Sequence, residues 1–318
     1  MQAWHTSGVS FDETVERLPL VSSVICPHCR GRLDRHEAEV ICRSCSARYP
    51  VLPGGYLNLT PPSSTIGLIE WSPDDVYLAE QDCGTARAER WLARHLRPGD
   101  RNALDIGCGT ASIGKMIAEL YPTIDVWGID LPGNLVGWKD AGANPERVLA
   151  GSALDLPFES GMFDLVWSFG VIEHIGEPDP PAERESDRLR YISEMMRVLR
   201  PGGRAIIVAP NKSFPLDPAH DWSATNFGHR LFERTHLCLH ATWGPHPLMS
   251  FQEVRRMARE AGASKVRPLN MANYFDFVRV GAGRAGRLVP VARFYLNLLP
   301  DWLGATPLAP FLAVELTR

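Results

Sequence analysis

Four cysteines near the start of the sequence form two Cys-x-x-Cys pairs, Cys26 with Cys29 and Cys42 with Cys45, and twelve residues separate the pairs. A Cys-x-x-Cys turn points two thiolates in the same direction, and zinc prefers four such ligands in a tetrahedron. Two pairs in one short segment favour a structural zinc site over a redox pair or a chance spacing. Because four cysteines complete the coordination shell, we do not expect this metal to take part in catalysis.

The remaining cysteines indicate a cellular setting. The chain has seven in all, and Cys83, Cys108 and Cys238 are isolated from the first four. Residues 1–18 mix charged and aromatic side chains with few apolar ones, unlike a secretory signal. An odd number of cysteines without such a signal argues against a disulfide framework. We therefore expect a reducing, cytoplasmic environment.

A second segment has the composition of a ligand-binding turn. The apolar run Ala103–Ile106 predicts a short strand, Gly107 and Gly109 predict a tight turn, and Thr110 begins a helical pattern. A glycine turn between a strand and a helix lets the backbone approach a nucleotide closely. The usual Gly-x-Gly-x-x-Gly form is incomplete because Ser112 occupies the third glycine position.

The strand expected next supports a nucleotide site. Ile124–Asp130 is largely apolar and ends in an acid about 20 residues beyond the glycines. A carboxylate at that place accepts hydrogen bonds from two ribose hydroxyls. The alternative is an ordinary α/β loop that ends in a solvated aspartate.

Composition sets the wider limits. The 318 residues carry a formal net charge of −4 and are 45% hydrophobic, so a globular protein of about two domains is expected. No apolar run is long enough to cross a membrane, so no transmembrane segment is expected. The acidic balance gives no broad surface for binding phosphate backbones.

Five segments in order resemble the motifs of class I S-adenosylmethionine-dependent methyltransferases. They are Leu104–Thr110 (motif I), Gly128–Asp130 (the ribose motif), Gly151–Phe158 (the adenine segment), Phe163–Ile175 (motif IV and its turn) and Tyr191–Val208 (a helix, a turn and the fifth strand). The resemblance implies an α/β fold: a Rossmann-like, seven-stranded sheet with helices on both faces, preceded here by the small zinc ribbon.

The resemblance also implies roles for individual residues. Asp105 would orient the ammonium group of the cofactor's methionine part, Asp130 would hold the ribose hydroxyls, and Leu131 would pack on the adenine. Ser152 stands where many members carry an aspartate, so a neutral hydroxyl replaces the charged acceptor of the adenine amino group. The further residues expected to border the cofactor are Gly107, Cys108, Gly109, Ala153, Phe169, Gly170 and Tyr77. Tyr77 is equally well explained as a core aromatic.

The sequence defines the residues that would contact the methyl acceptor less clearly. His174 follows the fourth strand in the turn that faces the methyl group in this family, which implies a base or a substrate contact. Its neighbour Glu173 is either catalytic or a structural carboxylate. Pro210–Met249 is rich in His, Trp and Pro and would cover the substrate, with His220, Trp222 and His229 as candidate contacts. The spacing of His236 and His240 fits an ordinary polar helix face better than a second metal site.

The ribbon carries a resemblance of its own. Ile25–Leu33 and Gly55–Leu59 are similar to the zinc module of the ribosomal RNA guanine methyltransferases, in which the ribbon helps to hold RNA. Gly170–His174, in contrast, is similar to the turn of small-molecule methyltransferases. Three functions stay open: a small-molecule methyltransferase, which we favour, an RNA methyltransferase, and a non-catalytic cofactor-dependent binding module. The oligomeric state is not predicted.

The expected domain division follows from these motifs. Residues 1–60 are assigned to the zinc ribbon and 61–100 to a linker and an N-terminal helix. Residues 101–318 are assigned to the methyltransferase domain, with a substrate-covering insertion at about 211–250. The cofactors expected are S-adenosylmethionine and a structural Zn²⁺.

Overall fold

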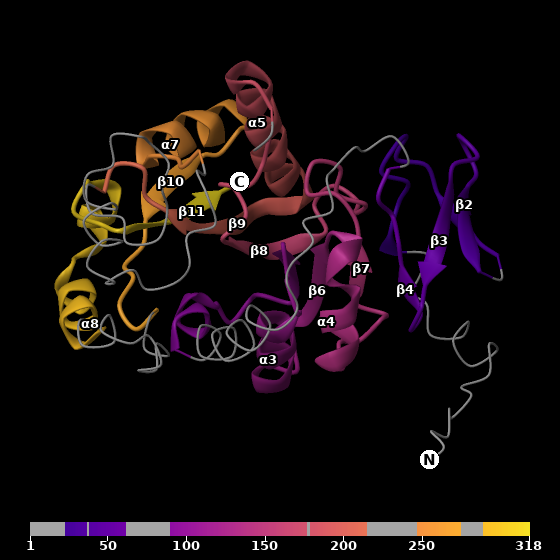
Figure 1. The fold of residues 1–318 in the computed structure, drawn as a ribbon, viewed down its shortest axis with the longest axis horizontal. Helices are drawn as coiled ribbons and strands as arrows, with labels where there is room; N and C mark the ends of the chain where they lie inside the picture. The colour runs from indigo at the N-terminus through magenta and orange to yellow at the C-terminus, as the bar shows by residue number, and fades with distance from the viewer. Residues whose placement is uncertain (1–22, 37, 62–89, 177–178, 215–246, 275–288) are drawn as a thin grey trace, which may run out of the picture.

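The computed structural model describes residues 23–36, 38–61, 90–176, 179–214, 247–274 and 289–318. Two sheets form within these ranges, a small one of four strands and a large one of seven. Figure 1 shows the small sheet lying beyond β7, at one end of the large sheet. The candidate residues Tyr77, His220, Trp222 and His229 lie outside the described residues, and so do His236 and His240.

The small sheet is antiparallel throughout, with its strands in chain order. Its strands are β1 (Leu33–Arg35), β2 (Glu39–Cys42), β3 (Arg48–Leu52) and β4 (Tyr56–Leu57). Gly54 and Gly55 have φ of 95° and 86° and make the turn between β3 and β4. Glycine adopts this left-handed conformation without the steric cost of a side chain.

The large sheet has the strand order β10-β11-β9-β8-β5-β6-β7. Its strands are β5 (Asn102–Ile106), β6 (Asp125–Asp130), β7 (Val148–Ala150), β8 (Phe163–Phe169), β9 (Leu199–Pro210), β10 (Lys265–Pro268) and β11 (Phe311–Thr317). Strands β5 to β9 pair in parallel, whereas β11 runs antiparallel to both β9 and β10. The strand order reverses between β5 and β8, which is where open α/β sheets bind ligands, at the carboxyl ends of the strands. The seven-stranded expectation is confirmed.

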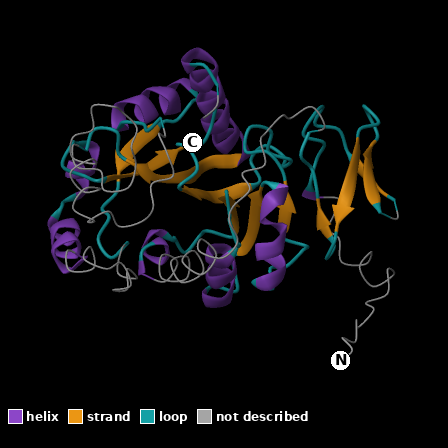
Figure 2. Cartoon of the chain, in the orientation of Figure 1, coloured by secondary structure: helices purple, strands orange, loops and turns teal. Residues whose placement is uncertain are grey.

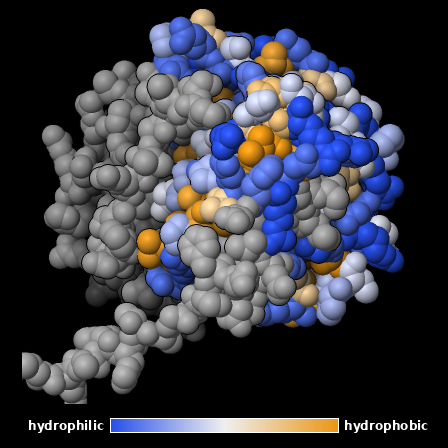
Figure 3. Space-filling view, turned by 90° about the vertical axis from the view of Figure 1, so that its right-hand side faces the viewer, coloured by the Kyte–Doolittle hydropathy of each residue, from blue (hydrophilic) through white to orange (hydrophobic). Residues whose placement is uncertain are grey.

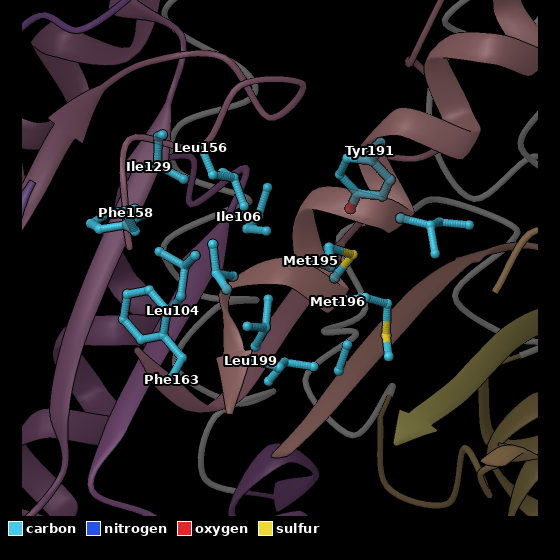
Figure 4. Close-up of a cluster of buried hydrophobic side chains, with 14 of the residues drawn as sticks. Leu104, Ile106, Ile129, Leu156, Phe158, Phe163, Tyr191, Met195, Met196 and Leu199 are labelled. Carbon is cyan, nitrogen blue, oxygen red and sulfur yellow. The ribbon is translucent and has the colours of Figure 1, made fainter. Parts of the chain in front are cut away.

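Helices cover both faces of the large sheet (Figures 1 and 2). The helices are α3 (Ser112–Leu120), α4 (Leu135–Asp140), α5 (Pro181–Val198), α7 (Phe251–Glu260) and α8 (Val289–Leu298), with 3₁₀ turns at Leu92–His95, Pro132–Asn134 and Asp301–Ala305. Alternation along β5 explains the two layers: Leu104 and Ile106 pack in the cluster formed with α5 and α7, while Ala103 packs with α3 on the other face. Figure 4 shows part of the first cluster, with Leu104 and Ile106 near Tyr191 and Met195 of α5.

Helix boundaries follow local chemistry more closely than the apolar pattern. The helix expected from Thr110 begins at Ser112, because Ala111 has a left-handed φ of 63°. In the region 61–100, for which a linker and a helix are expected, the described residues Leu92–His95 form a 3₁₀ turn. Ser250 and Glu253 form a capping box at the start of α7. Within the described ranges, none of the helices combines the length and apolar character needed to cross a membrane.

Candidate cofactor and metal sites

The glycine loop follows β5 and is fixed by the end of β6. The backbone N–H groups of Gly107 and Cys108 donate to the carbonyl of Ile129, at 2.8 and 3.2 Å. Gly107 has φ of 71°, and a Cβ built on it would lie 2.2 Å from the Cγ2 of Val171. Only glycine therefore fits at this position, which leaves the backbone open for close contact with a ligand.

Asp130 at the end of β6 is joined to the same loop. Its Oδ2 accepts from the N–H of Gly109 at 2.7 Å, and its Oδ1 accepts from the N–H of Leu131 at 2.7 Å. Burial raises the pKa of Asp130 to about 6, although these two hydrogen bonds act in the opposite direction. The side chain of Asn134 bonds the same carboxylate. An ionised carboxylate has about four acceptor positions, so about one is left for a ribose hydroxyl.

Asp105 lies one strand away, buried to 2% exposure in β5. A Cβ built on Gly114 would lie 3.9 Å from its Oδ2, so the carboxylate faces the first turn of α3. The positive end of the helix dipole favours a negative charge at this place. Asp105 is therefore positioned as a second acidic group of the site.

The expected adenine segment follows β7. Ser152 is buried, and its Oγ accepts from the N–H of Leu154 at 3.1 Å, which closes a local turn. A hydroxyl has two acceptor positions and one proton, so one acceptor position is used by the turn and the other is left for a ligand amino group. Ala153 is half-buried and packs against the apolar cluster beneath it.

The turn after β8 holds the expected catalytic pair. Gly170 has φ of 69°, and a Cβ built on it would lie 3.7 Å from the Oε1 of Glu173. Glu173 is 3% exposed, whereas His174 is half-buried and donates its backbone N–H to the carbonyl of Val171 at 2.9 Å. Phe169 packs edge-on against Trp91 and Tyr274, with ring centroids 5.9 and 6.1 Å away.

Two residues that hold these loops were not singled out from the sequence. The guanidinium of Arg188 is buried and donates to the backbone carbonyls of Glu173, Ile175 and Pro247, at 3.1, 3.3 and 2.5 Å. The indole of Trp138 donates to the carbonyl of Gly109 at 2.7 Å. Their signal was weak, because an arginine within a helix usually faces solvent and a tryptophan usually only fills the core.

The candidate cofactor-binding groups lie along one edge of the large sheet. The glycine loop, Asp130, Ser152 and Gly170 follow β5, β6, β7 and β8, and these four strands are neighbours in the sheet. Leu131 is half-exposed directly beyond Asp130. The set of groups, with backbone glycines, a ribose-competent carboxylate and a buried hydroxyl, fits an adenosine-containing cofactor.

The four N-terminal cysteines converge on one point. Their Sγ atoms all lie within 4.8 Å of one another, with Cys26 to Cys45 at 3.7 Å and Cys29 to Cys42 at 3.4 Å. Zinc bonds of about 2.3 Å in a tetrahedron place two sulfurs about 3.8 Å apart. The hydroxyl of Tyr49 lies 3.2 Å from the Sγ of Cys26. The donor set and its spacing therefore fit a closed zinc site.

Comparisons with known proteins agree with this geometry. Residues 104–207 match a family model described as a methyltransferase domain. Demethylmenaquinone methyltransferase of Symbiobacterium thermophilum is 28% identical over 188 residues, which are 53% of this chain and 70% of that protein. Tocopherol O-methyltransferase of Arabidopsis thaliana is 32% identical over 114 residues, 34% of this chain and only 30% of that protein.

Among solved structures, a similar chain comes from a complex of the Haloferax volcanii Trm112 methyltransferase activator with a methyltransferase. It is 18% identical, has a TM-score of 0.49, and the match covers 79% of this chain and 97% of that one. The matched residues 104–207 include the glycine loop, Asp130 and the turn after β8. Residues 104–207 therefore carry a methyltransferase domain.

Proposed function

We propose that the protein transfers the sulfonium methyl group of S-adenosylmethionine to a small-molecule acceptor. The observation that carries this proposal is Asp130, whose carboxylate is hydrogen-bonded to the glycine loop at Gly109 and keeps an acceptor position for a ribose hydroxyl. Gly107, Cys108 and Gly109 border the methionine part, with Asp105 as its acidic partner. Leu131, Ser152, Ala153, Phe169 and Gly170 line the rest of the cofactor, and Tyr77 closes its carboxylate end.

The chain's own residues have a limited chemical task. The bound cofactor supplies a methyl group already activated by its sulfur, so the protein has to align an acceptor atom and remove a proton where the acceptor keeps one. We assign proton removal to His174, because it is half-buried in the turn after β8. Glu173 beside it is buried against Gly170 and positions this turn. His220, Trp222 and His229 are the proposed acceptor contacts.

The ribbon's charge pattern supports a small acceptor over RNA. Of the five arginines in residues 26–60, Arg43 pairs with Asp34, Arg48 pairs with Glu39, and Arg30 pairs with Glu194 of the large domain. Each pair removes a positive charge that would otherwise face a phosphate backbone. Two of the relatives are named for demethylmenaquinone and tocopherol, which are small molecules.

We further propose that the cysteine cluster binds a structural Zn²⁺, with Cys26, Cys29, Cys42 and Cys45 as ligands. Thiolates must stay reduced to bind the metal, so the proposal includes a cytoplasmic setting. The domain division 1–60, 61–100 and 101–318 belongs to the same proposal. Zinc measured in freshly purified protein at one ion per chain supports it, and metal-free protein of normal stability contradicts it.

Methyl transfer from labelled S-adenosylmethionine tests the function. The acceptors are a panel of phenols, quinols and amines, with total RNA run beside them. We expect small acceptors to be labelled, and His174→Ala to lower kcat by about 100-fold or more while cofactor affinity is kept. His36→Ala, an exposed histidine of the ribbon, is the matched control. Labelled RNA with inert small acceptors, together with salt-dependent binding, would establish the RNA alternative instead.

A further inference from the structure

The ribbon and the methyltransferase domain share one apolar core. Leu57 and Leu59 of the ribbon belong to the same buried cluster as Ile129 and Leu149 of the large sheet and Leu156 of the adenine segment. Figure 1 shows β4 beside β7 at the edge of the large sheet. Where Figure 3 shows the described residues of this side of the molecule, they are mostly hydrophilic, and apolar residues stand in small separate groups. The ribbon's main apolar contact therefore faces the catalytic domain.

The ribbon holds the start of the adenine segment through its backbone. The N–H of Leu59 donates to the carbonyl of Ala150 at 2.7 Å, and Asn58 forms a parallel bridge with Ala150. Ala150 is the last residue of β7, two residues before Ser152. The chain after β4 thus extends the large sheet by one short pairing at the strand that leads into the candidate adenine site.

The ribbon also holds the other end of the same segment. The N–H of Ile25 donates to the carbonyl of Pro157 at 2.9 Å, and the guanidinium of Arg30 donates to the carbonyl of Leu156 at 3.1 Å. Arg30 also forms an ion pair of 2.9 Å with Glu194 of α5. The second oxygen of Glu194 accepts from the N–H of Leu156 at 2.9 Å, so one carboxylate joins the ribbon, the helix and the segment.

The surroundings of Glu194 favour the ionised form of its carboxylate in this contact. Burial raises its pKa, but hydrogen bonds from Arg197 and Arg30 outweigh the burial and lower the pKa below its usual range. Arg197 also donates to the carbonyls of Leu156 and Phe158, at 2.9 and 2.7 Å. The segment's far end is therefore held jointly, by α5 from its own domain and by Arg30 from the ribbon.

The backbone of Arg30 points to a constraint on this residue. It has φ of 62°, a left-handed conformation that favours glycine. A non-glycine residue in this region is strained, and it persists where the surrounding structure determines its position. Arg30 lies next to Cys29, so a zinc knuckle fixes the backbone whose side chain reaches the adenine segment.

We propose that the zinc ribbon, through Arg30, Ile25 and Leu59, is the positioning element of the adenine half of the cofactor site. Residues 151–155 lie between the two held ends, and Leu156 and Phe158 anchor the segment in the core beside Ile129 (Figure 4). Fixing both ends before the ligand arrives lowers the ordering cost of binding. The inference rests on the proposed function, since it assigns the segment to cofactor binding.

The decisive variant is Arg30→Gly in the full-length zinc-bound protein. Glycine suits a φ of 62°, so the ribbon should keep its metal and its fold, while the contacts to Leu156 and Glu194 are lost. Arg43→Ala is the matched control, because Arg43 pairs with Asp34 inside the ribbon, away from the segment. Arg30→Lys keeps the charge toward Glu194 and should restore part of the effect.

Calorimetric titration with S-adenosylhomocysteine is the first measurement. We expect Arg30→Gly to bind at least about threefold more weakly, with one zinc per chain and with Arg43→Ala equal to the wild type. Amide hydrogen exchange should rise in residues 151–158 of Arg30→Gly but not in the glycine loop 104–110. A merely structural loss would raise exchange in both segments.

Reciprocal linkage gives a second readout that does not depend on activity. If zinc and cofactor sites are coupled, S-adenosylhomocysteine must tighten zinc binding by the same factor by which zinc tightens S-adenosylhomocysteine. Equilibrium competition with a chromogenic chelator measures this factor, and we expect it to shrink in Arg30→Gly. Equal affinity and equal exchange in Arg30→Gly and wild type overturn the positioning role and leave the proposed function intact. A wild type that binds no S-adenosylhomocysteine overturns both.

Discussion

The two halves of the candidate cofactor site are held in different ways. The glycine loop is fastened by Ile129 and Asp130, which belong to the neighbouring strand of the same sheet. The adenine segment is fastened at both ends by the ribbon, and the Arg30 to Leu156 contact joins residues 126 positions apart in the chain. Among the described residues, the ribbon meets the glycine-loop side through the ring of Tyr56, which lies 5.3 Å from the ring of Trp138 and shares a buried cluster with Cys108.

One half of the cofactor site is thus held by contacts from the neighbouring strand, and the other half by contacts from a distant part of the chain. A turn whose contacts come from the next strand forms whenever the sheet forms. A segment held from another module depends on that module's own stability, here on a metal site. The glycine loop and the adenine segment should therefore respond differently when the zinc is removed or when Asp130 or Trp138 is substituted.

The largest effect is expected from removing a zinc ligand. Cys42→Ser should release the metal and unfold the ribbon, since structural zinc contributes roughly 10 kcal/mol of apparent binding free energy in small zinc domains. Cys42 is also buried in the core shared with the large domain, so the melting temperature should fall. Hydrogen exchange should rise strongly in 23–61 and 150–158, and less in 104–110. Ser44→Ala is the control. An equal rise of hydrogen exchange in the adenine segment and in the glycine loop would contradict the proposed difference between the two halves of the cofactor site.

The next largest effect is expected in the glycine-loop half of the cofactor site, at Asp130. Asp130→Ala removes the acceptor of the Gly109 and Leu131 N–H groups and of the ribose hydroxyls. Charged hydrogen bonds contribute about 1.5–3 kcal/mol each, so S-adenosylhomocysteine should bind roughly 100-fold more weakly. Asp125→Ala, at the opposite end of β6, is the matched control. Unchanged affinity in Asp130→Ala would remove Asp130 from the cofactor site.

A pH titration tests the same carboxylate without a mutation. Because burial raises its pKa to about 6, Asp130 gains a proton as the pH falls from 7 to 5 and loses acceptor capacity for the ribose. Cofactor affinity should therefore decline below about pH 6, approaching tenfold per unit at the acidic end.

The stability of the free protein should change in the opposite sense. Between the unfolded pKa near 4 and the folded pKa near 6, the folded state binds more protons, so the contribution of Asp130 to stability falls as the pH rises.

Titration calorimetry from pH 5 to 8 measures the cofactor affinity. An Asp130→Ala profile as steep as that of the wild type would assign the titration to another group.

The smallest effect is expected at the connecting tryptophan. Trp138→Phe keeps a ring against Tyr56 but removes the hydrogen bond to the carbonyl of Gly109. The loss of about 1 kcal/mol should weaken S-adenosylhomocysteine binding by about fivefold. Tyr56→Phe, which loses only a hydrogen bond to the carbonyl of Ala143, is the control. A larger effect in Tyr56→Phe would show that the ribbon also governs the glycine loop.

Much of the fold was accessible from residue patterns. Apolar runs ending in Gly107 and Asp130 predicted β5 and β6 because buried parallel strands read as continuous hydrophobic segments. The start of α7 is also a local feature, because the capping box of Ser250 and Glu253 sets it. The start of α3 was missed by two residues, since the left-handed Ala111 has no signal in composition.

By itself, the sequence determined the chemistry-bearing residues: two cysteine pairs at metal spacing, a glycine turn and an acid at the end of the following strand. These are short-range features, and their spacing is fixed by the geometry of a turn or a strand. Only the tertiary structure decided that Ser152 closes its own turn, that Arg188 holds the loop of Glu173, and that Arg30 reaches Leu156. Such contacts depend on which surfaces meet when the whole core is buried, and no local pattern records that choice.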